Sequence, residues 1–171
     1  MDSGPVPVRI AAVLVLMPGP KKDACVAPLR RLARTSGLHL TRFRMPSRRS
    51  AIAPTVERIL KVVRDVGLSA DRRADLAVAT AEALSNAAVH GNRMKPRAMV
   101  VVTVGVARHK VTIEVKDSGP GFDYTAVSDP TDPSNLLTPR GRGVFLMRRL
   151  VDHLEFHPPG NCVSLTLLAH P

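Results

Sequence analysis

The chain has 171 residues, which suits one domain with some additional length, and its 44% apolar composition is enough for a core and excludes wholesale disorder. The formal net charge is +11, but residues 1–50 carry ten basic and two acidic side chains, whereas residues 51–171 carry fifteen and twelve. Because this excess lies toward the N-terminus and stacking aromatic residues make up only 3%, we expect no direct nucleic-acid binding.

Residues 1–37 form the first predicted unit, an N-terminal extension whose role the sequence leaves open. Within it, Val8–Met17 could be a strand and Lys22–Thr35 a basic helix. The apolar run at Ile10–Met17 is too short to span a membrane and has a poor basic region before it, so it does not resemble a signal sequence. We therefore expect a cytoplasmic protein without membrane association. The extension could be a docking arm, a poorly ordered segment or the product of an upstream start site.

Residues 38–171 form the second predicted unit, with a pattern of strand, two helices, two strands, an irregular segment, a helix and two strands. Ser50 is the expected N-cap of the first helix, and Gly67 its end. This order predicts an α+β, two-layer sandwich with helices packed on one face of a mixed, mainly antiparallel sheet. The predicted ranges are 38–45, 50–67, 69–91, 98–107, 110–116, 117–143, 143–152, 154–157 and 162–169.

The second predicted helix carries polar residues one turn apart in an alanine-rich stretch. Glu82, Asn86 and His90 stand at i, i+4 and i+8, so they share one stripe of the helix. An amide oxygen is a hard, neutral Mg²⁺ ligand and a carboxylate can accept a proton, so Asn86 is a candidate metal ligand and Glu82 a candidate general base. A solvated polar face on an alanine-rich helix is an equally good interpretation of this stripe alone.

A second motif, Asp117-Ser-Gly119-Pro-Gly121, directly follows a predicted strand. A carboxylate at a strand end can accept a hydrogen bond from an exocyclic amine such as that of adenine, and the two glycines let the backbone come close to a ligand. Taken alone, the motif is more typical of a simple turn.

The third motif, Arg140-Gly141-Arg142-Gly143, leads into the third predicted helix. The glycines free the backbone, the arginines add positive charge, and a helix N-terminus offers amide donors, so the segment could hold phosphate. It lacks the Gly-Lys-Ser/Thr of a Walker sequence, and a basic surface loop is the alternative.

In this order and spacing, the three motifs resemble the Bergerat ATP-binding fold of the GHKL superfamily. More narrowly, the stretches 82–92, 117–123 and 135–152 are similar to the anti-sigma-factor serine/threonine kinases of bacterial partner-switching systems, and the likeness covers about residues 38–170. The resemblance implies that residues 38–171 are an ATP-binding kinase domain. The resemblance implies that Glu82 is the catalytic base, Asn86 the Mg²⁺ ligand and Asp117 the adenine contact. It implies that Gly119 and Gly121 shape the nucleotide wall and that Gly141 and Gly143 belong to the lid over the phosphates. On physical grounds we add Arg140 and Arg142 as phosphate contacts.

The resemblance further implies a homodimeric kinase that uses ATP and Mg²⁺ to phosphorylate a serine or threonine of an anti-sigma antagonist protein, and that binds a sigma factor. A non-catalytic ATP-binding switch for another protein partner is the alternative. The catalytic half of a histidine kinase is disfavoured, because the only histidine before the motif helix is His39, in a predicted strand.

One stretch departs from the superfamily pattern: Gly160-Asn161-Cys162-Val163 stands where many members have Gly-Thr close to adenine. This departure implies either weaker adenine binding or a water molecule in place of the threonine hydroxyl. The roles of His90 and Asn92 are left open.

Overall fold

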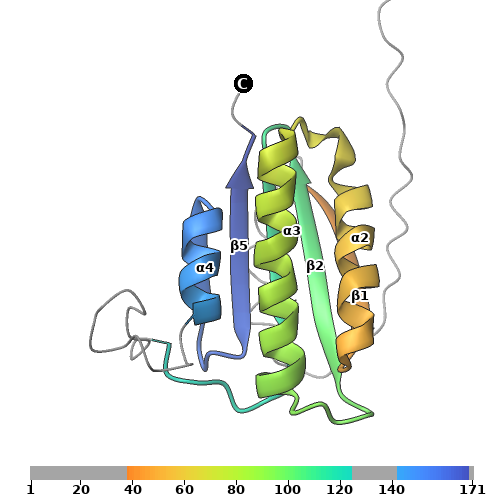
Figure 1. The fold of residues 1–171 in the computed structure, drawn as a ribbon, viewed down its shortest axis with the longest axis vertical. Helices are drawn as coiled ribbons and strands as arrows, with labels where there is room; N and C mark the ends of the chain where they lie inside the picture. Colours follow the sequence, from red (N-terminus) through yellow and green to blue (C-terminus); the bar gives the residue numbers. More distant parts are fainter. Residues whose placement is uncertain (1–37, 125–141, 170–171) are drawn as a thin grey trace, which may run out of the picture.

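The computed structural model describes residues 38–124 and 142–169, which form five strands and three α-helices in two layers (Figure 1). Two 3₁₀ turns, η1 (Arg49–Ala51) and η2 (Arg64–Val66), and a π-helix, η3 (Asn86–Gly91), complete the described elements. The strands are β1 (His39–Pro46), β2 (Met99–Ala107), β3 (Lys110–Lys116), β4 (His153–His157) and β5 (Cys162–Leu168), and the helices are α2 (Ile52–Val62), α3 (Ala70–Ser85) and α4 (Arg142–Leu150).

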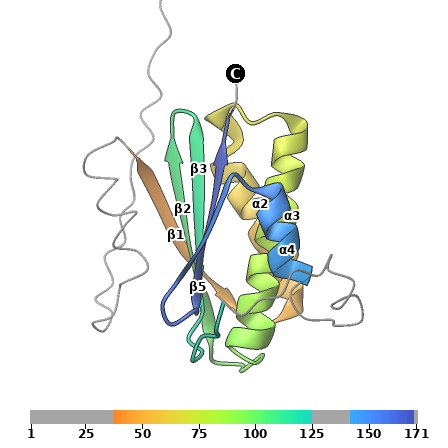
Figure 2. The same cartoon turned by 90° about the vertical axis from the view of Figure 1, so that its left-hand side faces the viewer.

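The strands form one sheet in the order β1-β2-β3-β5-β4, and all three helices cover the same face of it (Figure 2). Helix α3 lies between α2 and α4 along the middle of this layer (Figure 1). The predicted α+β sandwich is confirmed. All four strand pairings are antiparallel, however, so the described sheet is not mixed. Among the described residues, no helix has the length and apolar character needed to cross a membrane.

The helix starts show where local sequence signals succeed and fail. Ser69 is the N-cap of α3, and its side chain accepts a hydrogen bond from the Arg72 N–H at 3.2 Å. The prediction of Ser50 as N-cap of the preceding helix was wrong: Ser50 lies inside η1, and α2 begins after Ala51, which makes no side-chain cap. The chain enters α2 through a 3₁₀ turn, so the backbone bonds of that turn replace a side-chain cap.

The end of the second predicted helix also differs from a regular α-helix. Beyond Ser85 the helix continues as the π-helix η3, in which the Asn92 N–H donates to the Ala87 carbonyl at 2.8 Å, five residues back. The two residues after Asn92, Arg93 and Met94, have positive φ angles of 52° and 54°. A π-helix is rare, positive φ angles are uncommon for residues other than glycine, and both features are enriched at functional sites.

The core between the layers is aliphatic, as the scarcity of aromatic residues requires. Alternate residues of β2 and β3, such as Val102 and Ile113, are fully buried and face the helices. Leu76 and Leu84 of α3 and Met147 of α4 are also 0% exposed. These contacts fix α3 and α4 on the sheet and so determine where their polar residues lie.

The other face of the sheet is polar and contains one buried acid. Glu114 on β3 pairs with Thr103 of β2 and Ser164 of β5, and is only 2% exposed. Among the described residues, its Oε2 has no hydrogen-bond partner. Burial raises the pKa of Glu114 to about 7, against the opposing effect of the positive charges of Arg42 and Lys116.

This burial predicts a pH-dependent stability that Glu114→Gln should remove. The folded-state pKa of about 7 lies above the ordinary value of 4.5, so the folded protein holds this proton more tightly than the unfolded chain. The free energy of unfolding should therefore be highest below about pH 4.5 and fall as the pH rises toward 7. At about 1.4 kcal/mol per pKa unit, the full loss is on the order of 3–4 kcal/mol.

Urea denaturation of the wild type and of Glu114→Gln between pH 5 and 8 measures this effect. The neutral glutamine should gain stability relative to the wild type as the pH rises. A stability difference that stays constant over this range would contradict the prediction.

Candidate functional site

The first part of the site lies where α3 passes the start of α4. Glu82 and Asn86 are half-buried and stand one turn apart at the C-terminal end of α3. Gly143 of α4 lies directly against them: a Cβ atom added there would be 2.8 Å from Glu82 Oε2 and 3.5 Å from Asn86 Nδ2. The fold therefore brings together residues from two of the three sequence motifs.

The chemistry of this contact suits an anionic ligand with a cation. The N-terminus of α4 presents main-chain N–H groups and the positive end of the helix dipole. Asn86 offers a neutral amide oxygen and Glu82 a carboxylate, which are ligand types that Mg²⁺ accepts. Arg142, the first residue of α4, is exposed. Arg140 and Gly141 lie outside the described residues.

The second part of the site surrounds the Asp117 carboxylate, which lies in a niche between two glycines. The Gly119 N–H donates to Asp117 Oδ1 at 2.6 Å. A Cβ at Gly91, the last residue of η3, would be 2.2 Å from the Asp117 Cγ, and one at Gly119 would be 2.3 Å from the Gly91 carbonyl oxygen. The Asp117 carboxylate can lie here only because residues 91 and 119 are both glycine.

Burial raises the pKa of Asp117 above its ordinary value. The N–H groups of Gly119 and Asp117 itself, and the charge of Lys116, act in the opposite direction. A recessed carboxylate of this kind has limited access to water and is suited to accept a directional hydrogen bond from a bound polar group.

Asn92 connects this niche to two other parts of the chain. It is 3% exposed, its Nδ2 donates to Ser47 Oγ at 2.8 Å, and its Oδ1 accepts from the Ser118 N–H at 2.8 Å. The side chain thus joins the end of η3, the residue after β1 and the loop after β3. The sequence left the role of Asn92 open, and in the structure its side chain holds the loop that carries Asp117. His90, by contrast, is exposed.

The turn between β4 and β5 supports the same loop from the other side. The Asn161 carbonyl accepts from the Asp117 N–H at 3.0 Å, and its Nδ2 donates to the Gly119 carbonyl at 3.2 Å. Asn161 belongs to the stretch that replaces the expected Gly-Thr, and its side chain secures the loop backbone. Gly121 has φ +84°, and a Cβ there would be 2.0 Å from the Pro159 carbonyl oxygen. Its close contact is therefore with this turn.

Three residues that shape the site were not singled out as site residues in the sequence. Ser47 and Asn161 are ordinary polar residues, and their importance comes only from contacts across the fold. Gly91 ends the motif helix, where a glycine is usual on conformational grounds. The sequence therefore did not indicate that this glycine lies against Asp117. Among the described residues, no group of three or more His, Cys, Asp or Glu side chains is arranged to hold a metal ion.

Comparison with known proteins identifies the family of the domain that contains these motifs. The family model of the histidine kinase-like ATPase domain matches residues 45–167. The serine-protein kinase RsbW of Bacillus velezensis is 30% identical over 100 residues, which cover 55% of this chain and 62% of that protein. The RsbW proteins of Bacillus subtilis and Oceanobacillus iheyensis are 29% and 26% identical over 100 and 102 residues, or 62% and 65% of their lengths. The similarity thus spans less than two thirds of each relative.

The Asp117 niche predicts that Asp117→Asn weakens adenine-nucleotide binding. The amide keeps the size of the side chain and an oxygen for the Gly119 N–H, but it loses the charge and one acceptor oxygen. Loss of a charged hydrogen bond of about 1.5–3 kcal/mol corresponds to roughly ten- to a hundredfold weaker binding. Titration calorimetry with ATP or ADP measures the affinity.

Gly91→Ala tests the niche without changing the carboxylate, because its methyl group would occupy the space of the Asp117 side chain. Gly105→Ala is the matched control: a Cβ there would be 3.3 Å from the flexible ends of the Leu38 and Leu40 side chains. Equal nucleotide affinity in Asp117→Asn and the wild type would refute the adenine contact.

Proposed function

Since the chain belongs to the family of histidine kinase-like ATPase domains, we propose that it is an ATP-dependent protein serine/threonine kinase that acts as an anti-sigma factor. Its substrate would be a serine or threonine of an anti-sigma antagonist protein. The relatives named serine-protein kinase support this proposal, as does the set of residues that meet at the start of α4.

The contact between Glu82, Asn86 and Gly143 is the observation that carries the proposal. A phosphoryl-transfer site needs a cation ligand, a group that accepts the proton of the attacking hydroxyl, and donors for the phosphate oxygens. Asn86, Glu82 and the main chain at the start of α4 provide these three functions at one place. A structural ion pair would explain Glu82 less well, because Ser85 and Asn86 occupy the i+3 and i+4 positions.

The residues present fit Mg²⁺ and ATP, so each part of the ligand can be assigned to a part of the site. Asn86 would hold the metal through its amide oxygen, and Asp117 would accept a hydrogen bond from the adenine amine. Main-chain N–H groups at Gly143, together with Arg142, would face the phosphates, joined by Arg140 and Gly141. When bound, Mg²⁺-ATP supplies the phosphoryl group, and the metal neutralises part of its charge.

Glu82 is the proposed proton acceptor for the hydroxyl of the protein substrate. Its carboxylate lies beside the N-terminus of α4, so a hydroxyl approaching the phosphate end of the site would meet it. The rest of the catalysis would come from positioning, because phosphoryl transfer requires little covalent chemistry from the protein.

The proposed partners are a sigma factor, an antagonist protein and a second copy of this chain, and the proposed location is the cytoplasm. These assignments rest on the resemblance to the anti-sigma kinases. If the site binds nucleotide without transfer, the protein acts instead as a nucleotide-dependent switch for a protein partner.

Glu82→Gln should separate these two functions. Glutamine keeps the size and polarity of the side chain but cannot accept the proton, so phosphoryl transfer should fall by roughly 10²–10⁴-fold. Nucleotide binding should persist, because Asn86, Asp117 and Gly143 remain. The assay follows label from radioactive ATP onto a serine or threonine of a candidate antagonist, with calorimetry for binding.

Glu57→Gln, on the exposed surface of α2, is the control for removing one negative charge. Transfer by Glu82→Gln at the wild-type rate would show that Glu82 is not the base. If the wild type binds ATP but labels none of the candidate antagonists, the kinase proposal fails and the nucleotide switch replaces it.

A further inference from the structure

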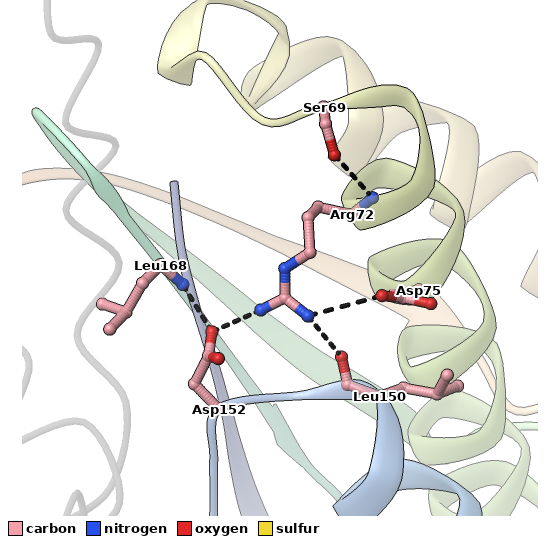
Figure 3. Close-up of polar contacts among 6 residues, drawn as sticks. All are labelled: Ser69, Arg72, Asp75, Leu150, Asp152 and Leu168. Carbon is pink, nitrogen blue, oxygen red and sulfur yellow. Dashed lines mark hydrogen bonds and ion pairs between the residues drawn. The ribbon is translucent and has the colours of Figure 1, made fainter. Parts of the chain in front are cut away.

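A side-chain network outside the site lies at the opposite end of the α3–α4 pair, around Arg72 (Figure 3). Arg72 stands in the first turn of α3, and its side chain is 23% exposed. Its Nη1 donates to the Leu150 carbonyl oxygen at 3.2 Å and to Asp75 Oδ2 at 3.3 Å. Its Nη2 makes a charged hydrogen bond to Asp152 Oδ2.

These bonds attach α3 to the end of α4. Leu150 is the last residue of α4, where backbone carbonyls have no partner within the helix and a cation is favourable. The planar guanidinium reaches this carbonyl and the Asp152 carboxylate with two different nitrogens. Asp75 lies one turn further along α3 and accepts from Nη1, which directs the guanidinium toward α4.

The same network reaches the sheet. Asp152 Oδ2, the atom that accepts from Arg72, also accepts from the Leu168 N–H at 2.7 Å (Figure 3). The Asp152 N–H donates to the Thr166 carbonyl oxygen at 3.0 Å. The segment after α4 is thus held to β5 by Asp152 and to α3 by Arg72, so the end of α4 is fixed relative to both layers.

Helix α4 is nine residues long, and its two ends meet α3 through contacts of different kinds. At the C-terminal end, Arg72 makes directional hydrogen bonds to Leu150 and Asp152. At the N-terminal end, Gly143 is in close contact with Glu82. A short helix moves as a rigid body, so a shift at the Arg72 end must change how Gly143 lies over Glu82.

We propose that Arg72 is a positioning residue that holds α4 at the spacing from α3 needed to place Gly143 against Glu82 and Asn86, and so supports the phosphate end of the site. This inference rests on the proposed nucleotide function for the identity of the ligand, but its structural part does not depend on it. Arg72 lies far from the reacting groups along α3 and acts only through α4.

The location of Arg72 predicts a selective effect on binding. Asn92, Asn161 and the glycines hold the Asp117 niche. The side-chain hydrogen bonds of Arg72 go to Asp75, Leu150 and Asp152 and to none of these residues. Arg72→Ala should therefore weaken Mg²⁺-ATP binding by roughly tenfold, in line with other residues that orient a site through an intermediate group. The affinity for adenosine, which has no phosphate, should stay within about twofold of the wild type.

The matched control is Arg73→Ala, which removes the same side chain from an exposed position in the same helical turn. It should leave both affinities unchanged. Arg72→Lys keeps the charge but loses the planar pair of donors, so it should restore only part of the ATP affinity. If Arg72→Ala does not fold, Asp152→Asn provides a second variant, because it keeps an acceptor for the Leu168 N–H but weakens the bond to Arg72.

A measurement without nucleotide distinguishes this inference from the proposed function. With ¹³C-methyl-labelled methionine, NMR can follow Met147, which is 0% exposed on α4, and Met45, which is 1% exposed on β1. We expect the Met147 methyl resonance to shift in Arg72→Ala and in Asp152→Asn, and the Met45 resonance to remain in place.

An unchanged Met147 resonance in the folded variants would overturn the inference, whether or not the protein binds nucleotide. A lower melting temperature with ATP and adenosine affinities both unchanged would also overturn it, because Arg72 would then serve stability alone. If the wild type binds neither ligand, the proposed function fails, and the Met147 shift still decides whether Arg72 positions α4.

Discussion

Besides Leu76 and Leu84, helix α3 buries several very small side chains, and the arrangement of the site depends on the close packing that these allow. Its buried face and that of η3 contain Ala79, Ala83, Ala87 and Ala88. Alanine has no side chain beyond Cβ, so the helix axis can lie close to neighbouring elements. The alanine side chain also loses no conformational entropy when the helix forms. Larger residues would move α3 outward and separate Glu82 from Gly143 and Gly91 from Asp117. The alanine-rich pattern is therefore a requirement of the site as much as of the core.

The residues with candidate chemical roles are held by others that have none. Asp117 and Gly119 lie on a loop that cannot form part of the sheet, and its polar backbone groups need partners. Asn92 and Asn161 provide these partners from opposite sides, and Ser47 completes the bonds of Asn92. Substitution of a supporting residue can thus reduce ligand binding without removing any group that contacts the ligand.

The two ends of the site are held by independent sets of interactions. Side-chain to main-chain bonds fix the Asp117 niche to η3 and to the turn between β4 and β5. The other end, where Gly143 lies against Glu82, depends instead on the position of α4, which Arg72 bonds to α3. Interactions that share no partner make nearly additive contributions, so the two ends of the site can change separately.

The sequence by itself determined the fold class, the positions of most strands and helices, and the set of candidate site residues. It could do so because hydrophobic periodicity reports which side of an element is buried, and because the motifs occur in a characteristic order. It did not determine the start of α2, the π-helix η3 or the antiparallel direction of every strand pairing. Nor did it indicate that Arg72 bonds to Asp152, 80 residues away, or that Asn161 supports the Asp117 loop. The start of α2 and the π-helix depend on backbone bonds between residues three to five apart, which hydrophobic periodicity does not report. Only the tertiary structure decided the other features, because each depends on which distant groups packing brings into hydrogen-bonding distance.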